Sequence, residues 1–424
     1  ATETLKDDVM TISADIEELS AQKVRLNEEL AESRAKNDRL EELGNEARDK
    51  LLSKVEEINA LSNKSQLDKE RLSTIERDTE RFSDEKQELD EKLIRELNNR
   101  KELEESRDEI QKSLESEEEK PCFAGKANLG RVVLRVQFGE KSFFFPVRYA
   151  FPKAKRPAPV FVVLNFRPDV PDLYLPAEEI LDGGFGFAQI CYTDVVNDRY
   201  HGDFSDGLGK AYYEGRARRP DEWGKIGMWA YAASRAIDWL YTREEADRAH
   251  IMVIGHSRLG KTALYAGMSD ERIWATFVND SGAGGASIAR HKETGETIHD
   301  IAKNGLWDWF ADNYRRWENR EAEMPFDMHF AVAMIAPRLV CVGSAEEDAW
   351  AEPEGECLSC RAASEVWKLL GRRGLEMPDR AAVPGESFLT GSVGYQMRSG
   401  THFLSRTDWQ KYMEFARIHI NEET

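Results

Sequence analysis

The stretch that decides the fold is His250-Ile-Met-Val-Ile-Gly-His-Ser257-Arg-Leu-Gly-Lys261-Thr262. Its apolar run 251–254 predicts a buried strand, and residues 263–268 favour a helix. A tight turn through Ser257 joins the two. Junctions of this kind, from a strand through a turn to a helix, are where α/β proteins place nucleophiles and bind phosphates.

This stretch matches two motifs. Gly255-x-Ser257 predicts a nucleophile elbow with Ser257 exposed on the turn, whereas Gly255-x-x-x-x-Gly260-Lys261-Thr262 is a complete Walker A loop that would aim Lys261 at phosphates. A Walker A loop usually opens its domain and needs a magnesium-binding acid on another strand, which residues 276–280 could supply. At least three predicted strands precede the motif here, which disfavours a Walker A loop without excluding it. A P-loop nucleotidase using Gly255–Thr262 is therefore the competing hypothesis.

Outward from this junction, predicted strands and helices alternate. The strands are 160–164, 187–191, 274–278 and 338–342, and the helices are 177–181, 223–240, 360–370 and 407–420. A β-hairpin, 131–138 and 142–148 around Gly139-Glu-Lys141, precedes them, and 200–219 is expected to be an irregular loop. This order predicts an α/β-hydrolase fold, with a mainly parallel sheet between two layers of helices.

Residues 1–118 differ from the rest because they contain no proline, no tryptophan and one glycine, Gly44. Mostly apolar residues recur every seven positions in two interleaved series whose register runs without a skip, such as Leu5, Ile12, Leu19 and Leu26 with Val9, Ile16 and Leu30. Polar residues such as Lys23 and Asn37 interrupt the series and weaken the expected seam. This repeat predicts a left-handed coiled coil on the order of 170 Å long that forms a homodimer. We expect the rod to end at Pro121, so the predicted domains are 1–118 and 119–424.

Composition excludes several classes of function. The formal net charge is −20, so no basic surface for nucleic acid is expected. No run of about 18 apolar residues is present, so no transmembrane helix is expected. The start, Ala1–Lys6, lacks a signal-peptide pattern, and the compartment stays open. Cys357-x-x-Cys360 is half of a zinc-ribbon pattern without its second half, so we expect thiols or a local disulfide, and no metal or cofactor.

An α/β-hydrolase needs a serine, an acid and a histidine in that chain order. Ser257 is the candidate nucleophile. His402 is the candidate base because it lies in a glycine-containing loop before the last helix, whereas His291, His299, His329 and His419 fit surface or packing positions better. Asp280 ends the strand after the elbow helix, and Asp348 follows the next strand. Either could hold the imidazole, so the acid is left open.

Five motifs then occur in one order: Gly255-x-Ser257-Arg258-x-Gly260-Lys261, Asp280-Ser-Gly-Ala-Gly-Gly285, Gly295-Glu296, Asp348-Ala-Trp350 and Thr401-His402-Phe403. From about residue 130 to 420 they resemble the glucuronoyl esterases of carbohydrate esterase family 15, the bacterial branch most closely. The resemblance implies hydrolysis of esters of (4-O-methyl-)glucuronic acid, the linkage between xylan and lignin, so glucuronoxylan or a lignin–carbohydrate ester is the expected substrate.

The resemblance also implies roles for individual residues. Ser257 would be the nucleophile, His402 the base, and Asp280, Asp348 or both the acid. Arg258 would support the oxyanion hole, Lys261 and Glu296 would bind sugar hydroxyls, and Trp350 would line the uronate pocket. Fungal members have Glu at the Asp280 position and Cys at the His256 position, and the rod is outside the family pattern. The sequence also fits an esterase for acetylated sugars, or a non-catalytic coiled-coil interaction protein.

Overall fold

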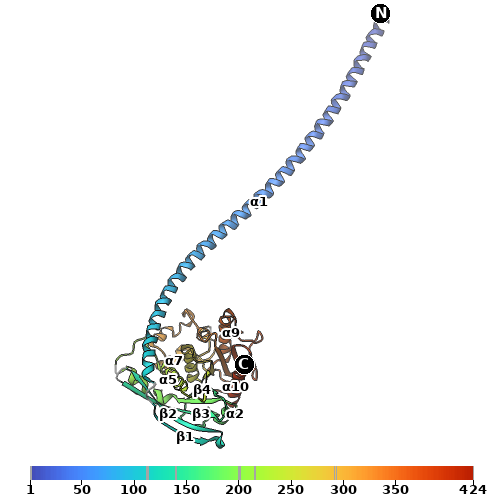
Figure 1. Ribbon diagram of the computed structural model, residues 1–424. Coiled ribbons are helices and arrows are strands. Elements are labelled where there is room, and N and C mark those ends of the chain that lie inside the picture. The colour runs from blue at the N-terminus through green and yellow to red at the C-terminus, as the bar shows by residue number, and fades with distance from the viewer. Residues whose placement is uncertain are drawn as a thin grey trace. The chain divides into compact units, whose positions relative to one another are not determined.

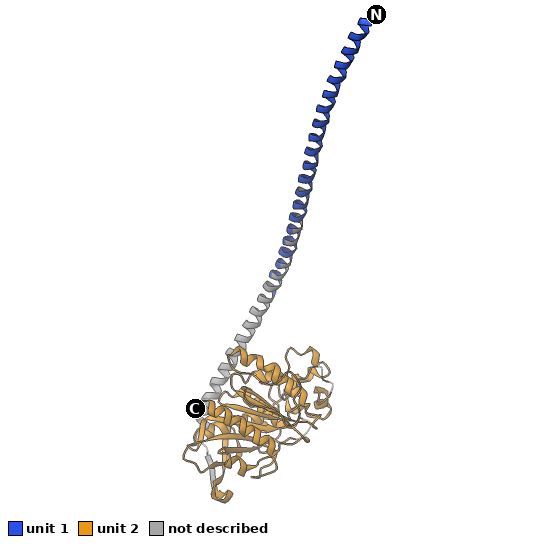
Figure 2. Ribbon diagram, turned by 90° about the vertical axis from the view of Figure 1, so that its right-hand side faces the viewer, with its two compact units in different colours: residues 1–100 blue, residues 101–424 orange. Residues whose placement is uncertain are grey.

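The computed structural model describes residues 2–110, 114–138, 141–198, 202–213, 216–290, 292 and 294–423. Some predicted features lie outside this range: the hairpin turn at 139–140, His291, and residues 199–201 and 214–215 of the expected loop. The chain divides into two compact units, residues 1–100 and 101–424 (Figure 2).

The first unit is a single long helix, α1, which spans Thr2–Ile110 and so continues past the unit boundary (Figure 1). The apolar residues of the seven-residue series point to solvent along its described part, with exposed fractions from 50% at Leu30 to 66% at Leu51 and Leu61. Series positions from Ile75 to Leu114 lie outside the residues whose side chains are described. The structure therefore shows a single helix with an exposed apolar seam. It does not show whether two such helices pair into a coiled coil.

The second unit contains a sheet in which ten strands lie within the described residues. They are β1 Leu114–Cys122, β2 Ala127–Phe138, β3 Lys141–Pro152, β4 Ala158–Asn165, β5 Gly186–Cys191, β6 Ala246–His256, β7 Ala275–Asn279, β8 Leu339–Ala345, β9 Ser387–Phe388 and β10 Val393–Arg398. Their order is β1-β2-β3-β5-β4-β6-β7-β8-β10-β9. The six strands from β5 to β10 in this order pair in parallel, and antiparallel strands flank them on both sides.

Helices cover both faces of the sheet (Figure 1). They are α2 Ala177–Asp182, α3 Tyr192–Val195, α4 Gly207–Tyr213, α5 Lys225–Leu240, α6 Arg258–Ser269, α7 Ile298–Lys303, α8 Met328–Ala333, α9 Pro353–Leu369 and α10 Arg406–Glu423. Short 3₁₀ turns include η2 Trp307–Trp309 and η3 Asp312–Trp317. Within the described residues, no helix has both the length and the apolar composition needed to cross a bilayer.

The strand β6 shows why the sheet is buried on both sides. Successive side chains of a strand point to opposite faces. Ile251 and Val253 therefore pack in the core cluster with α5 and α6, whereas Met252 and Ile254 pack in the cluster with α2 and α10. Because both faces of β6 are covered at residues 251–254, this run can be apolar throughout, as buried parallel strands in α/β proteins usually are. The predicted mainly parallel sheet between helical layers is confirmed.

Two local predictions were wrong, and one predicted helix has a different start. The helical pattern was expected to reach residue 118, but α1 ends at Ile110 and Leu114–Cys122 forms β1, antiparallel to β2. The segment 200–219, expected to be irregular, contains α4. The helix expected at 360–370 begins earlier, at Pro353, which occupies its first turn, where a proline costs no hydrogen bond.

Candidate active site

The elbow places Ser257 between the end of β6 and the start of α6. Its backbone is in an unusual conformation, with φ 58° and ψ −128°. Gly255 makes the turn possible, because a Cβ there would lie 2.0 Å from the carbonyl oxygen of Leu259. Gly260 lets α6 approach β7, since its Cβ would lie 2.8 Å from the Asn279 oxygen. Gly260, which lies one position later than the second glycine of Gly-x-Ser-x-Gly, therefore allows the helix α6 to pack closely against the strand β7.

His402 lies in the loop between β10 and α10, and its ring is partly exposed. Its Nδ1 is 2.5 Å from Oδ2 of Asp348, which is buried in the loop after β8. The other oxygen of Asp348 accepts a hydrogen bond from the Ala351 backbone. Burial raises the pKa of Asp348, but the hydrogen bond and charge of His402 outweigh it and bring that pKa below the usual value.

Asp280, the other candidate acid, has different partners. Oδ1 accepts a hydrogen bond from the Ala345 backbone at 2.7 Å, and Oδ2 lies 3.5 Å from Nη2 of Arg398. Burial and the neighbouring carboxylates of Glu356, Asp348 and Asp408 raise the pKa of Asp280 well above its usual value, against the opposing effect of Arg398. The structure therefore brings His402 together with Asp348 by a hydrogen bond, and Asp280 with Arg398.

Arg398 organises the loop that carries His402. Its Nη2 donates to the carbonyl oxygens of Thr401 and Phe403, which flank His402, and its Nε donates to Asp408 at the start of α10. The side chain is buried. Sequence reasoning did not identify Arg398, because its partners come from the end of β7, the loop and α10 and share no local pattern.

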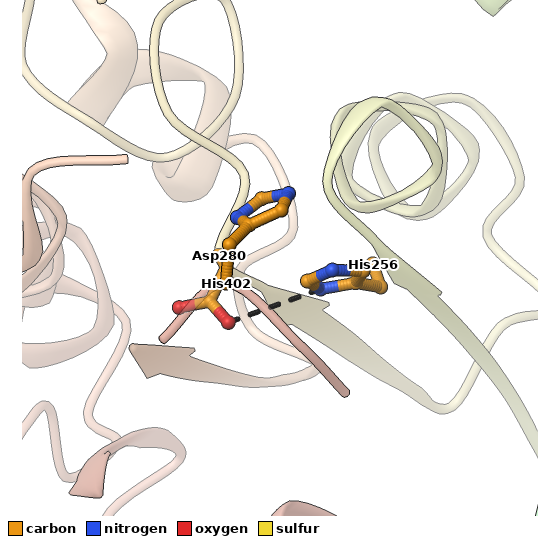
Figure 3. A group of neighbouring side chains, drawn as sticks. All are labelled: His256, Asp280 and His402. Carbon is orange, nitrogen blue, oxygen red and sulfur yellow. Dashed lines mark ion pairs between the residues drawn. The ribbon is translucent and has the colours of Figure 1, made fainter. Parts of the chain in front are cut away.

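His256 lies directly beneath His402. Figure 3 shows the two imidazole rings beside the Asp280 carboxylate, and the ring centroids of the histidines are 4.4 Å apart. Nδ1 of His256 is 2.7 Å from the Asn279 side-chain oxygen and 3.8 Å from Asp280. Burial and the neighbouring His402 lower the pKa of His256 to about 3, so it is neutral at ordinary pH.

His256, Asp280 and His402 each offer one potential metal-ligand atom within 4.8 Å of the others. Protein groups already occupy these side chains: Asn279 contacts His256, Ala345 and Arg398 contact Asp280, and Asp348 contacts His402. These contacts use Nδ1 of both histidines and both carboxylate oxygens of Asp280. The cluster therefore fits a hydrogen-bonded catalytic network better than a metal centre.

Arg258, next to Ser257, is held by two residues that sequence reasoning missed. Its guanidinium forms an ion pair with the buried carboxylate of Asp198 and lies 4.8 Å from the ring centroid of Trp309. The Trp309 Nε1 donates to the same carboxylate at 2.7 Å. Asp198 and Trp309 are 60 and 51 positions away in the chain, so only the fold unites the three groups.

Lys261 is buried, and its ammonium group is bound within the protein. Its Nζ donates to the carbonyl oxygens of Ser281 and Ala283 and to Oε2 of Glu296, at 2.6–2.7 Å. All three ammonium hydrogens therefore have protein acceptors. Thr262 donates to the Arg258 carbonyl instead of facing a metal-binding position. These contacts argue against a P-loop.

Glu296 and Trp350 lie on two segments that are joined by a backbone hydrogen bond. The Glu296 N–H donates to the Trp350 carbonyl at 2.8 Å, and the Trp350 side chain is 49% exposed. Gly295, at φ 83°, permits this contact because its Cβ would lie 2.7 Å from Glu352. Asp348 and Trp350 thus belong to one loop that is fixed against the Glu296 segment.

Comparisons with known proteins identify relatives of this chain. A family model described as "Glucuronyl esterase, fungi" matches residues 134–371. Carbohydrate esterase MZ0003, from an unknown prokaryotic organism, is 37% identical over 246 residues, which cover 57% of this chain and 55% of that protein. The 4-O-methyl-glucuronoyl methylesterase of Hypocrea jecorina is 35% identical over 156 residues, covering 35% and 34% of the two chains. The chain thus spans about half, or less, of these relatives' lengths.

Solved structures show the same relationship. The glucuronoyl esterase of Solibacter usitatus has a TM-score of 0.66 and 33% identity, and the match covers 72% of this chain and 85% of that one. A promiscuous CE15 esterase from the marine bacterial metagenome has a TM-score of 0.63 and 29% identity over 74% and 91% of the two chains. The family model covers more than half of this chain and the Solibacter protein supports it, so the chain belongs to the glucuronyl esterase family, carbohydrate esterase family 15.

Proposed function

We propose that this chain is a serine esterase that hydrolyses esters of (4-O-methyl-)glucuronic acid, as found between xylan and lignin. The observation that carries the proposal is the hydrogen bond between His402 and the buried Asp348, in a chain whose Ser257 occupies a positive-φ elbow. Family membership supports the ester chemistry and the uronic acid.

The proposed reaction has two halves. His402 takes the proton of Ser257 while the serine oxygen attacks the ester carbonyl, and His402 returns that proton to the departing alcohol. Water then attacks the acyl-enzyme with His402 again as base, and glucuronate leaves. Asp348 accepts a hydrogen bond from Nδ1 of His402 and so stabilises the positively charged imidazole.

Both tetrahedral intermediates carry a negative oxygen, which needs donors fixed in advance. The backbone N–H of Arg258 opens α6, where the helix dipole favours negative charge. The Arg258 guanidinium adds a positive charge beside Ser257, and Asp198 and Trp309 hold it in place. We infer that these two donors form the oxyanion site.

The uronate sugar would lie against Glu296 and Trp350. Lys261 donates to Oε2 of Glu296 and thereby orients the carboxylate, which leaves Oε1 for a sugar hydroxyl. We propose that Lys261 acts mainly through Glu296, since its three donors are used within the protein. Trp350, half exposed on the Asp348 loop, offers a flat apolar surface for the sugar ring.

The test is hydrolysis of benzyl glucuronate and of 4-nitrophenyl acetate by the wild type and by Ser257→Ala. We expect turnover of the glucuronate ester that requires Ser257. If only 4-nitrophenyl acetate is hydrolysed, and Ser257 is required, the protein is an acetyl esterase and the proposed uronate site is wrong. Turnover of neither ester, together with magnesium-dependent ATP binding that Lys261→Ala abolishes, would support the nucleotidase.

We propose a separate role for the helical rod, residues 1–118 in the sequence and α1 in the structure. The exposed apolar seam of α1 would be buried by a second copy of the chain, so the protein would be a coiled-coil homodimer that carries two esterase units. If the esterase proved inactive, this rod would be the working part of an interaction protein.

A further inference from the structure

A cavity of about 1580 Å³ takes no part in the proposed reaction. Its walls come from Lys141 and Ser142 of β3, from residues within 202–213, which contain α4, and 216–218, and from residues within 302–315, which contain η2 and part of η3. Among the described residues, the cationic side chains that line it are Lys141, Lys210, Arg216, Arg218, Lys303 and Arg315, and the carboxylates are Asp308 and Asp312.

The two carboxylates do not neutralise this wall. Asp308 is buried and forms an ion pair with Lys225, a fully buried residue behind the cavity, and Asp312 is 2.5 Å from Arg218. Arg216 is paired with Glu222. Lys210, Lys303 and Arg315 have no carboxylate partner among the described side chains, and each is exposed. Among the described residues, the cavity therefore has more cationic than anionic side chains, in a chain whose net charge is negative.

Aromatic rings stand among these cations. Phe204, Tyr213 and Trp307 line the cavity, and the Arg315 guanidinium lies 5.1 Å from the Trp307 ring centroid. Sugar rings have apolar C–H faces that pack on aromatic rings, and a uronic acid adds a carboxylate for the cations. A site with both kinds of group suits an acidic sugar better than a small inorganic ion, which would not use the rings.

The cavity shares a wall with the proposed oxyanion site. Trp307 and Asp308 of η2 line the cavity, whereas Trp309 of the same turn packs on Arg258 and donates to Asp198. One three-residue turn, η2, therefore contributes both to the wall of the cavity and to the packing of Arg258, the residue next to Ser257. This arrangement fits a polymer that reaches both places at once.

We propose that this cavity binds a free, unesterified uronate on the same polysaccharide chain whose esterified uronate lies at Ser257. The inference rests on the proposed function and extends it, because it makes an acidic polysaccharide with several uronate branches a better substrate than a single sugar ester. Lys210, Lys303 and Arg315 would supply the charge, and Phe204, which is less buried than Tyr213 and Trp307, would supply the apolar ring surface.

The first experiment measures binding. The variant is Lys210→Gln/Lys303→Gln/Arg315→Gln in the full chain, and the matched control is Lys153→Gln/Lys155→Gln/Arg156→Gln, which removes the same three charges around a different depression. Isothermal titration with glucuronate-substituted xylotriose and with unsubstituted xylotriose compares the ligands. We expect the cavity variant to lose at least tenfold affinity for the acidic oligosaccharide, with the control unchanged and unsubstituted xylotriose unaffected.

The second experiment separates this inference from the proposed function. On benzyl glucuronate the cavity variant should keep the wild-type kcat/KM, and on a methyl-esterified glucuronoxylan with remaining free uronates its KM should rise. If the wild type hydrolyses no glucuronate ester, the proposed function fails and the titration still tests the cavity. The inference would be overturned if the cavity variant and the control bound the acidic oligosaccharide with equal affinity. It would also be overturned if the protein bound ATP more tightly than that oligosaccharide.

Discussion

Asp348 and Asp280 follow neighbouring strands, β8 and β7, yet their surroundings suit different tasks. Asp348 contacts Nδ1 of His402, and that contact lowers its pKa despite burial, so it stays negative beside the imidazole. Asp280 faces Arg398 and the Ala345 backbone, and burial raises its pKa well above the usual value. A carboxylate that readily accepts a proton stabilises a positive imidazole less well.

The first prediction concerns these two acids. Asp348→Asn should lower kcat on benzyl glucuronate by roughly 10³–10⁴-fold, the scale seen when a triad acid becomes an amide. Asp280→Asn should cost about tenfold or less, since it perturbs the position of Arg398 and leaves the His402 contact intact. Steady-state kinetics with both variants, at matched folded fractions by circular dichroism, tests this. A larger loss for Asp280→Asn would reassign the acid.

The second prediction concerns His256 and pH. Its pKa falls from the ordinary 6.5 to about 3 on folding, so the unfolded chain binds a proton that the folded chain excludes between these values. Stability must therefore fall as pH drops from about 6.5 towards 3, by at most about 1.4 kcal/mol per pH unit. His256→Gln should flatten the slope of the unfolding free energy, measured by urea denaturation from pH 6.5 to 4.5. An unchanged slope would show that His256 does not titrate this way.

The residues of the candidate site could be named from the sequence because their motifs are local. Ser257 follows a strand and a glycine, and His402 precedes the last helix. The choice between Asp280 and Asp348 could not be made, because parallel strands end at one edge of the sheet and either carboxylate can reach it. Asp198 and Trp309 had no signal because they meet Arg258 only in the fold. Arg398 had none because its partners near in the chain, such as Thr401, form no recognisable motif, and Asp280 is distant.

At the scale of elements, the elbow depends on how closely α6 packs against β7. The third prediction is that Gly260→Ala destabilises the second unit by about 1–3 kcal/mol, because the new Cβ would lie 2.8 Å from a backbone oxygen of Asn279 that cannot move freely. Urea unfolding followed by tryptophan fluorescence measures this, since the rod contains no tryptophan.

The matched control for that substitution is Gly44→Ala in α1, where a Cβ would meet nothing within 4 Å. It should leave the fluorescence transition unchanged and raise helix content, since alanine favours a helix over glycine by roughly 1 kcal/mol. A neutral effect of Gly260→Ala would mean that the helix and the strand are not in such close contact.

The elements that sequence patterns failed to predict are those whose structure depends on pairing. β1 contains Glu-Ser-Glu-Glu-Glu-Lys-Pro, which has low strand propensity and continues the composition of the rod, and its pairing with β2 makes it a strand. β10 contains buried Gln396 and Arg398, whose polar groups are satisfied by Asp408 of α10. The strands 158–165 and 246–256 were predictable because their central runs are apolar throughout.

At the scale of the whole molecule, the exposed apolar seam of α1 is the basis of the proposed coiled-coil dimer. The fourth prediction is that the full chain sediments as a dimer and that Leu19→Glu/Leu26→Glu shifts it towards the monomer, because both leucines belong to the seven-residue series and are more than 60% exposed on the single helix. Val24→Glu/Leu52→Glu, equally apolar but outside the series, is the matched control and should remain dimeric.

Sedimentation equilibrium at several micromolar concentrations decides between these outcomes. A monomeric wild type, or equal dissociation of both variants, would contradict a coiled coil in this register. The net charge of −20 and the polar residues within the series predict that the dimer is only moderately stable, so the measurement includes a range of salt concentrations.

The central claim is that Ser257 is an activated nucleophile in a uronate site. The most direct test is labelling of the full chain with a fluorophosphonate, followed by intact-mass analysis and peptide mapping. We predict one adduct per chain, on the peptide that contains Ser257, slowed by excess glucuronic acid and by Asp348→Asn, and absent from Ser257→Ala. A label that persists in Ser257→Ala, or that maps to another residue, would contradict this assignment.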